Sequence, residues 1–312
     1  MFGWISGIFL GWSIGANDTS HCFGTAVSSR MVPWRLAAIL MAFFVILGAV
    51  LQGAEGVETL RRLAPQSPQN AAISALAAAL AVALMTLFRL PVSTTHAVVG
   101  AILGVGLMQG HVQTAGVQKI VLCWIGTPVG AMLLYVFFHL LLSRWIRRKR
   151  PGLFTLDPLL RGGLIACGCY AAYALGANNV ANVAAVLVVG TGMDVQPAMA
   201  VGAVAIAAGT LTFSRGVMHT VGNGIARIGS YEALVALLSM AVVTHLYAIL
   251  GVPVSTAHGI IGALLGLGLV QGMQVIHWRT LGRIALAWVA TPVLAGLIAA
   301  AIYFVEHLRY TP

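Results

Sequence analysis

Long apolar runs separated by short polar segments dominate the chain, and this pattern predicts membrane-spanning helices. In the first half, apolar residues occupy most of 3–27, 36–53, 71–88 and 117–143, and comparable runs follow in the second half. Runs of about 18–25 apolar residues are long enough to cross a bilayer as a helix, and these lack the strict alternation of barrel strands. We therefore expect an all-α integral membrane protein.

Two polar motifs interrupt the apolar runs, and each motif occurs twice. The first is Gly15–His21, which returns as Gly176–Asn182, and the second is Pro91–His96, which returns as Pro253–His258. Polar groups at membrane depth are costly unless they are paired or bind something. We therefore interpret both motifs as polar breaks in helices, and we expect them to form the functional site.

The motifs keep their order in the two halves, which indicates an internal duplication. Corresponding landmarks lie 161 to 164 positions apart, as in the pairs Gly15 and Gly176, Pro91 and Pro253, and Thr127 and Thr291. We assign residues 1–150 to the first repeat and residues 151–312 to the second. Repeats of this size in a membrane protein are typical of transporters.

The distribution of basic residues predicts that the two repeats are inverted. The densest basic run is 144–150, and the segments 28–35 and 214–230 also carry arginine, whereas 190–197, the counterpart of 28–35, carries no basic residue. Basic loops stay on the cytoplasmic side of a bacterial-type inner (plasma) membrane. With the 144–150 loop placed in the cytoplasm, the two halves must have opposite orientations.

The composition supports this class and excludes others. Hydrophobic residues make up 60% of the 312 residues and charged residues only 8%, against about 25% charged residues in soluble domains. The net charge of +10 comes without a nucleic-acid motif, so we attribute it to membrane topology and expect lipid, not nucleic acid, as a partner. The four cysteines lack metal-ligand spacing, and we expect no metal centre or cofactor. We read the first apolar run as a membrane segment and not as a signal peptide.

The apolar segments that flank the second motif permit two topologies. Proline followed by consecutive Ser and Thr breaks a helix, so the flanking segments are either two full spans or the arms of a re-entrant hairpin with the motif at its tip. We favour the hairpin, because broken backbone at membrane depth is tolerated only around a cavity. Both topologies keep an odd number of crossings per repeat, with about 10 membrane segments in total.

Asp18 is the acidic residue that we place deep in an apolar run, while the other six acidic residues lie in loops or at segment ends, two of them in a polar loop expected from about Glu55 to Asn70. A central carboxylate costs roughly 2.5–3.5 kcal/mol on insertion scales, which indicates a cation ligand or a proton carrier. His21 follows three residues later and could relay protons with Asp18. Amide oxygens suit hard cations and amide NH2 groups suit anions, and the motifs supply four amides, Asn17, Asn178, Asn179 and Asn182.

Hydroxyl side chains follow the proline of the second motif in both copies, namely Ser93, Thr94, Thr95, Ser255 and Thr256. A helix that restarts after a break offers free N–H groups and a positive dipole end, which suit an oxyanion. Two such ends that converge by symmetry could hold a tetrahedral oxyanion. We expect His96 and His258 to orient the loops by hydrogen bonding. Arg89 precedes the first Pro motif and could either attract the anion or extend to the membrane interface.

These motifs resemble those of the inorganic phosphate transporter (PiT) family. Its repeated signature is similar to Gly15–Asp18 with Phe23–Val27 and to Gly176–Asn182, and Pro-Val-Ser-Thr-x-His is similar to its second motif in both halves. The resemblance implies inverted repeats, a phosphate site at their interface and coupling to Na⁺ or H⁺. It carries binding roles over to Asn17, Asp18, Ser93, Thr94, Thr95, Asn178, Asn179, Asn182, Ser255 and Thr256.

Two positions depart from the family pattern. Asn179 stands where the family usually has a second Asp, and His21 stands where it usually has Asn. Loss of one carboxylate weakens a cation site and removes an acceptor for a protonated anion. In this respect the chain resembles a sulfate-transporting branch of the family, which lacks the paired acids. Because Asp18 is kept and phosphate carries a proton to donate, we favour phosphate over sulfate. His21 favours H⁺ over Na⁺ as the coupling ion, although a bound Na⁺ stays an alternative.

We therefore predict a secondary active symporter of inorganic phosphate that works by alternating access. The alternatives are a sulfate permease of the same fold, an anion channel, and an intramembrane hydrolase that uses Ser93, His96 and Asp18. A catalytic triad is needed only once, whereas the Ser/His motif is duplicated, so we expect no enzyme. A homodimer is compatible with the sequence.

Overall fold

The computed structural model describes residues 1–63, 67–88, 92–218 and 228–310, so that Arg89 and the first proline of its motif lie outside the described residues. The first half contains α1 (Phe2–Ser28), α2 (Trp34–Gln52), α3 (Glu55–Arg61), α4 (Pro68–Leu87), α5 (Thr94–Met108) and α6 (Thr114–Lys149). The second half contains α7 (Leu153–Thr191), α8 (Val195–Phe213), α10 (Ser230–Ile249), α11 (Thr256–Gln271), the short 3₁₀ turn η1 (Met273–Val275) and α12 (Trp278–Tyr310).

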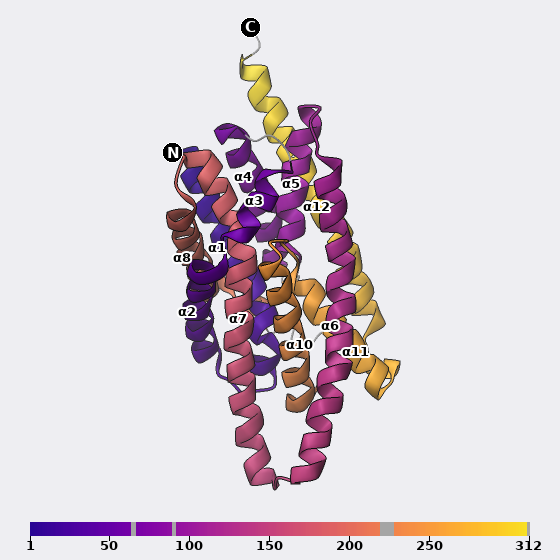
Figure 1. The fold of residues 1–312 in the computed structure, drawn as a ribbon. Coiled ribbons are helices and arrows are strands. Elements are labelled where there is room, and N and C mark those ends of the chain that lie inside the picture. Colours follow the sequence, from indigo (N-terminus) through magenta and orange to yellow (C-terminus); the bar gives the residue numbers. More distant parts are fainter. Residues whose placement is uncertain (64–66, 89–91, 219–227, 311–312) are drawn as a thin grey trace.

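The helices on either side of the second motif pack against each other in each repeat, α4 with α5 and α10 with α11, as expected for the two arms of a hairpin. Figure 1 shows α4 and α5 in the upper half of the bundle, where both termini lie, and α10 and α11 in the lower half. Among the described residues seven helices are long and apolar enough to span a membrane, and these include α4 and α10. The other arms, α5 and α11, are apolar but shorter than these seven helices.

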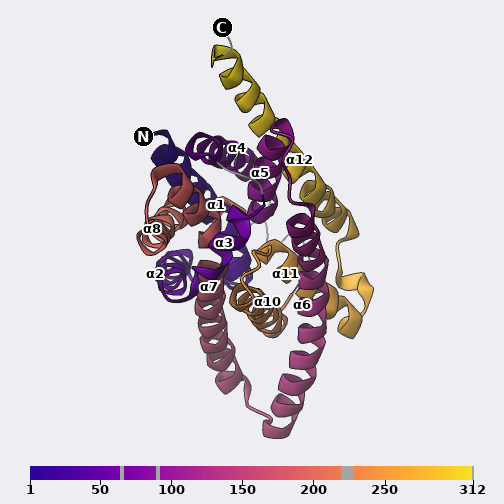
Figure 2. The ribbon, with the colours of Figure 1, turned by 45° about the horizontal axis from the view of Figure 1, so that its top comes forward.

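The two repeats are interlocked. Helix α1 packs on α8 and α7 packs on α2, while α5 packs on α12 and α11 on α6. A Cβ added at Gly15 would lie 1.9 Å from the carbonyl oxygen of Ile206, and one added at Gly176 would lie 2.2 Å from that of Val45. These paired close approaches, together with hairpins that open toward opposite ends (Figures 1 and 2), confirm the predicted inverted duplication.

Three sequence-based expectations need correction. The first motif does not break its helices, because α1 and α7 run without interruption through Gly15–His21 and Gly176–Asn182. The basic run 144–150 is not a loop, since α6 continues through Lys149. The polar segment expected as a loop from 55 to 70 contains α3, in which Glu58 pairs with the arginines that follow it.

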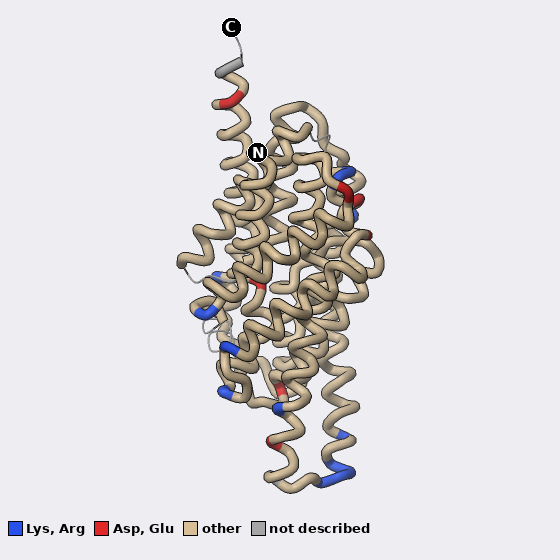
Figure 3. Tube along the Cα trace, turned by 90° about the vertical axis from the view of Figure 1, so that its left-hand side faces the viewer, with Lys and Arg blue, Asp and Glu red and all other residues tan. Residues whose placement is uncertain are grey.

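Figure 3 shows that Lys and Arg gather in the lower half of the molecule, around and above the turn between α6 and α7. A smaller mixed group of acidic and basic residues lies on the opposite half, where α3 packs against α7. This asymmetry follows the charge pattern that predicted inversion, because the basic segments of both repeats reach the same end of the bundle.

Candidate functional site

The candidate site is centred on Asp18, which lies on α1 at the contact between the two repeats. Thr94 Oγ1, from the first turn of α5, donates to Asp18 Oδ2 at 2.7 Å. Asn179 Nδ2, from α7, donates to the same oxygen at 2.5 Å. Asp18 is only 1% exposed. A buried carboxylate thus joins a hairpin tip of its own repeat to the first-motif helix of the other repeat.

Asn17 and Asn178 hold the non-helical backbone of the two hairpin tips. Asn17 Oδ1 accepts from the amide of Val92 at 3.2 Å, and Asn178 Oδ1 accepts from the amide of Val254 at 3.2 Å. Asn178 Nδ2 also donates to the Val254 carbonyl at 2.6 Å. Irregular backbone at membrane depth requires such partners. Each first motif therefore supports the break in the second motif of its own repeat.

The two hairpin tips place helix N-termini beside each other. Ser93 and Ser255 are N-caps, since their Oγ atoms accept from the amides of His96 at 3.2 Å and His258 at 3.3 Å. Thr95 Oγ1 donates to the carbonyl of Val254 at 3.2 Å and so bridges the tips. First-turn amides have no partner within their own helix. The positive ends of α5 and α11 consequently meet at the repeat interface.

His21 and Asn182 occupy equivalent positions on the opposite side of the cluster. His21 Nδ1 lies 3.3 Å from Thr256 Oγ1 and 4.0 Å from Asp18 Oδ1. Asn182 Nδ2 donates to Thr95 Oγ1 at 3.4 Å. The side chains predicted for the site, which all lie in the described part of the chain apart from Arg89, thus form one buried cluster.

Three buried polar atoms of this cluster make no hydrogen bond within the described residues. They are Asp18 Oδ1, His21 Nε2 and Asn182 Oδ1. Buried polar atoms are almost always paired in native proteins. The three atoms are therefore the positions at which a bound ion or a proton would complete the hydrogen bonding of the cluster.

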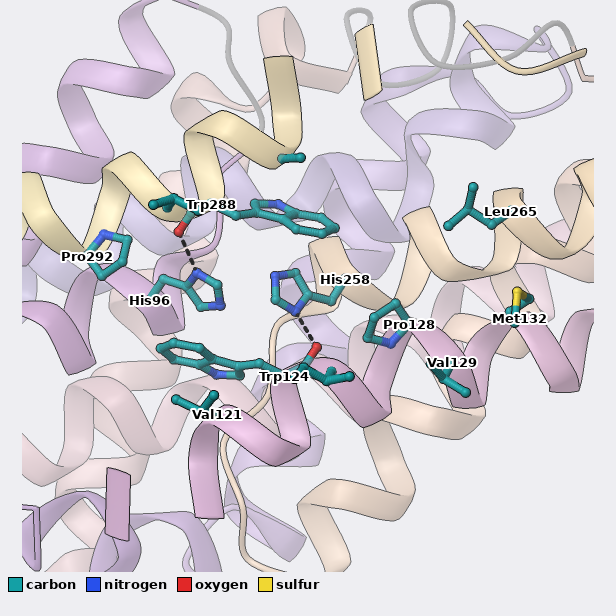
Figure 4. Close-up of a pocket in the computed structure, with 13 residues that line it drawn as sticks. His96, Val121, Trp124, Pro128, Val129, Met132, His258, Leu265, Trp288 and Pro292 are labelled. Atoms are coloured by element: carbon teal, nitrogen blue, oxygen red, sulfur yellow. Dashed lines mark hydrogen bonds between the residues drawn. The ribbon is translucent and has the colours of Figure 1, made fainter. Parts of the chain in front are cut away.

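The histidine of each second motif binds the opposite repeat (Figure 4). His96 Nδ1 lies 2.9 Å from the carbonyl oxygen of Trp288, and His258 Nδ1 lies 3.0 Å from that of Trp124. Each of these carbonyls precedes a helix proline by four positions, so no helical amide can pair with it. The imidazole Nδ1–H supplies the missing donor. Each histidine, which we expected to orient its loop, therefore has a specific partner in the other repeat.

The same residues reveal a feature that sequence reasoning missed. The rings of His96 and Trp124 lie 3.7 Å apart and those of His258 and Trp288 lie 3.9 Å apart, next to an apolar cavity of about 800 Å³. Each tryptophan stands three residues before Thr127 or Thr291, the threonines that mark the duplication in the sequence. Duplication of an aromatic residue at the same offset was the available signal.

The residues proposed for a hydrolase are not assembled as a triad. Ser93 Oγ caps the helix, His96 Nδ1 faces a carbonyl of α12, and Asp18 binds Thr94 and Asn179. A triad requires the base to contact both the nucleophile and the carboxylate. The arrangement instead suits reversible binding of a small ion.

Comparisons with known proteins agree with this geometry. A relative from Pyrococcus furiosus named "Putative phosphate permease" is 29% identical, with 95% of this chain and 93% of the relative aligned. Sulfate permease CysP of Bacillus subtilis is 27% identical over 92% of this chain and 82% of its own length. A solved structure titled "The sodium-dependent phosphate transporter" has the same fold, with a TM-score of 0.84, 24% identity and 98% of both chains covered.

The family model described as the phosphate transporter family matches this chain twice, at residues 14–159 and 154–299. The double match agrees with the duplication seen in the sequence and in the helix packing. Together the two matches cover most of the chain. The chain therefore belongs to the phosphate transporter family, a family of membrane transporters and not of enzymes.

Proposed function

We propose that this protein is a secondary active symporter of inorganic phosphate that works by alternating access. The observation that carries the proposal is the unpaired Asp18 Oδ1 beside the N-termini of α5 and α11. A site with both helix N-termini and a carboxylate offers donors for the oxyanion oxygens and one acceptor for an O–H group. Phosphate presents both kinds of group.

Sulfate is the second candidate, and two observations favour it. Asn179 stands opposite Asp18 where a second carboxylate would favour a protonated anion, and the sulfate permease of Bacillus subtilis is among the relatives. Sulfate at neutral pH has no proton to donate, so an unpaired carboxylate oxygen would repel it. The retained Asp18 therefore supports phosphate.

The hydrogen bonding of the cluster supports H⁺ as the coupling ion. The side-chain oxygens of Asn17, Asn178 and Asn179 each accept a hydrogen bond in this conformation. Among the carboxylate and amide oxygens of this cluster, Asp18 Oδ1 and Asn182 Oδ1 make no hydrogen bond within the described residues. Hard cations need several oxygen ligands, whereas a proton needs one acceptor. His21, 4.0 Å from Asp18 Oδ1, offers a second proton position.

Transport requires that the cluster open alternately to each side, because its side chains are almost fully buried in this conformation. The hairpins enter from opposite ends, so movement of one tip exposes the site toward one side only. Helix α3 packs on α7 and contacts the second hairpin, where Thr59 Oγ1 donates to the carbonyl of Gly251 at 2.6 Å. We assign the basic end to the cytoplasm of a bacterial-type plasma membrane.

Uptake into proteoliposomes tests the proposal. Labelled phosphate and labelled sulfate are offered separately, with an imposed pH gradient, with a Na⁺ gradient, or with neither. Phosphate accumulation that follows the pH gradient is expected. Accumulation only with a Na⁺ gradient would identify Na⁺ instead of H⁺ as the coupling ion, and accumulation only of sulfate would identify sulfate instead of phosphate as the substrate. Flux of neither anion, or flux at channel rates without any driving gradient, would refute the symporter.

A further inference from the structure

A pocket with a partly basic and partly apolar lining lies between α1, α2 and α7, and none of the candidate-site residues line it. Its volume is about 430 Å³, and it is formed by the end of α1 and the turn after it, the start of α2, α7 and Arg215, the second residue after the end of α8. Three arginines line it together with an apolar wall, namely Arg30, Arg161 and Arg215 with Val27, Met31 and Trp34.

The three guanidinium groups have no acidic partner in the part of the chain that the structure describes. The ion pairs found there involve other residues, and none joins a carboxylate within 4 Å to any of these arginines. Asp157 lies one helical turn before Arg161 on α7 but does not form an ion pair with it. Three cations around one pocket repel each other unless an anion lies between them.

The backbone and an aromatic ring hold two of the arginines in place. Arg30 takes a left-handed conformation with φ 59°, which is unfavourable for a residue with a Cβ. The guanidinium of Arg215 lies over the Trp34 ring, 5.9 Å from its centroid, and Trp34 Nε1 donates to Ser214 Oγ at 3.4 Å. The first turn of α2 begins beside them without a side-chain cap, so its amides face the same region.

We propose that this pocket binds the phosphate group of an anionic phospholipid headgroup. Guanidinium groups match phosphate oxygens in geometry and charge, and basic pockets between membrane helices at the cytoplasmic side suit anionic headgroups. Trp34 is the residue type that marks the membrane–water interface. Free phosphate has the same chemistry but would leave the apolar wall uncovered, so the lining favours the lipid.

A bound headgroup would connect the two repeats at the end opposite to α3. Arg30 belongs to the first repeat, whereas Arg161 and Arg215 belong to the second. The lipid would thus bridge the turn between α1 and α2 to α7 and to the end of α8, and of these helices α1 and α7 carry residues of the candidate site.

Native mass spectrometry of the purified full-length protein tests the proposal. Titration with phosphatidylglycerol and with phosphatidylcholine is compared for wild type and for R30Q/R161Q/R215Q. Neutralising one arginine should weaken phosphatidylglycerol binding roughly fivefold, equivalent to about 1 kcal/mol, so the triple variant should lose roughly 100-fold. In a matched control, the three arginines of 144–148 are changed to glutamine, and this variant should keep its affinity.

Two results would overturn the lipid assignment. Equal losses in both triple variants would indicate general attraction to a basic surface, and an unchanged affinity in the pocket variant would exclude the pocket. A separate arm adds inorganic phosphate, and displacement of phosphatidylglycerol at millimolar phosphate would identify a free-anion site instead. Because a triple variant could misfold, R161Q alone is also measured, since Arg161 is exposed at the start of α7, and it should show the fivefold loss.

Discussion

Replacing Asp18 by Asn removes the charge at the centre of the site while keeping the shape of the side chain. Asp18 Oδ2 accepts from Thr94 and from Asn179, and Oδ1 is unpaired. In D18N one oxygen can still accept from both donors, but the other position becomes an NH2 group. A phosphate O–H then meets a donor instead of an acceptor, and no proton can be carried at this position.

The expected loss of phosphate affinity in D18N follows from the hydrogen bond that is removed. Hydrogen bonds to a charged group contribute about 1.5–3 kcal/mol, against about 0.5–1.5 kcal/mol for neutral pairs. Loss of the acceptor for phosphate should therefore weaken phosphate binding roughly 10- to 100-fold. Removing the buried charge also relieves an insertion cost of about 2.5–3.5 kcal/mol. Stability should consequently stay equal or rise while transport falls.

Two transport modes are measured in proteoliposomes, together with thermal unfolding. Gradient-driven accumulation should be abolished in D18N, whereas slow phosphate exchange at high substrate persists. Asp157→Asn is the matched control, because this carboxylate lies near the start of α7 and outside the cluster, and it should transport as wild type. Full concentrative uptake by D18N would refute the role of Asp18. A large loss of stability would show that its charge is structural.

Three further changes test the supporting contacts. Thr94→Val removes the hydroxyl that donates to the central carboxylate, so initial uptake should fall about tenfold, while Thr94→Ser should retain most of it; equal activities would contradict the contact. His258→Ala leaves the carbonyl four residues before Pro128 unpaired and should cost about 1–3 kcal/mol in denaturant titrations. Adding Pro128→Ala restores an amide donor and should recover part of that loss, whereas simple additivity would argue against the pairing. Gly15→Ala places a Cβ 1.9 Å from a backbone oxygen of α8 and should abolish a monodisperse peak in size-exclusion chromatography, whereas Gly162→Ala meets nothing within 4 Å and should elute normally.

Some expectations failed because tertiary contacts override local preference. Asn and Gly are weak helix formers, so the first motif looked like a break, yet Asn17 and Asn178 remain helical and use their amides to hold the hairpin tips. Helix α3 has only seven residues, too few to be stable alone. It forms against α7, where a Cβ on Gly56 would lie 2.9 Å from that of Ala181.

The partners of the second-motif histidines also depend on the fold. The sequence indicated that His96 and His258 orient the loops, but their acceptors lie in the other repeat. Those carbonyls lack a helical donor because of Pro292 and Pro128, and the carbonyls lie 192 and 134 residues along the chain from the histidines that pair them. No local sequence pattern links a histidine to such a distant proline, although both the histidines and the prolines are duplicated.

The sequence by itself determined the class, the duplication and its inversion, and it named the residues that the structure brings together in one buried cluster. The hydropathy and charge of each segment govern how that segment inserts into the membrane. A duplicated motif such as Gly15–Asp18 identifies the equivalent residues of the other repeat. Only the tertiary structure decided how the backbone at the second motifs is held, because its partners lie far away in the sequence. The amides of Val92 and Val254 donate to Asn17 and Asn178, which come from facing helices.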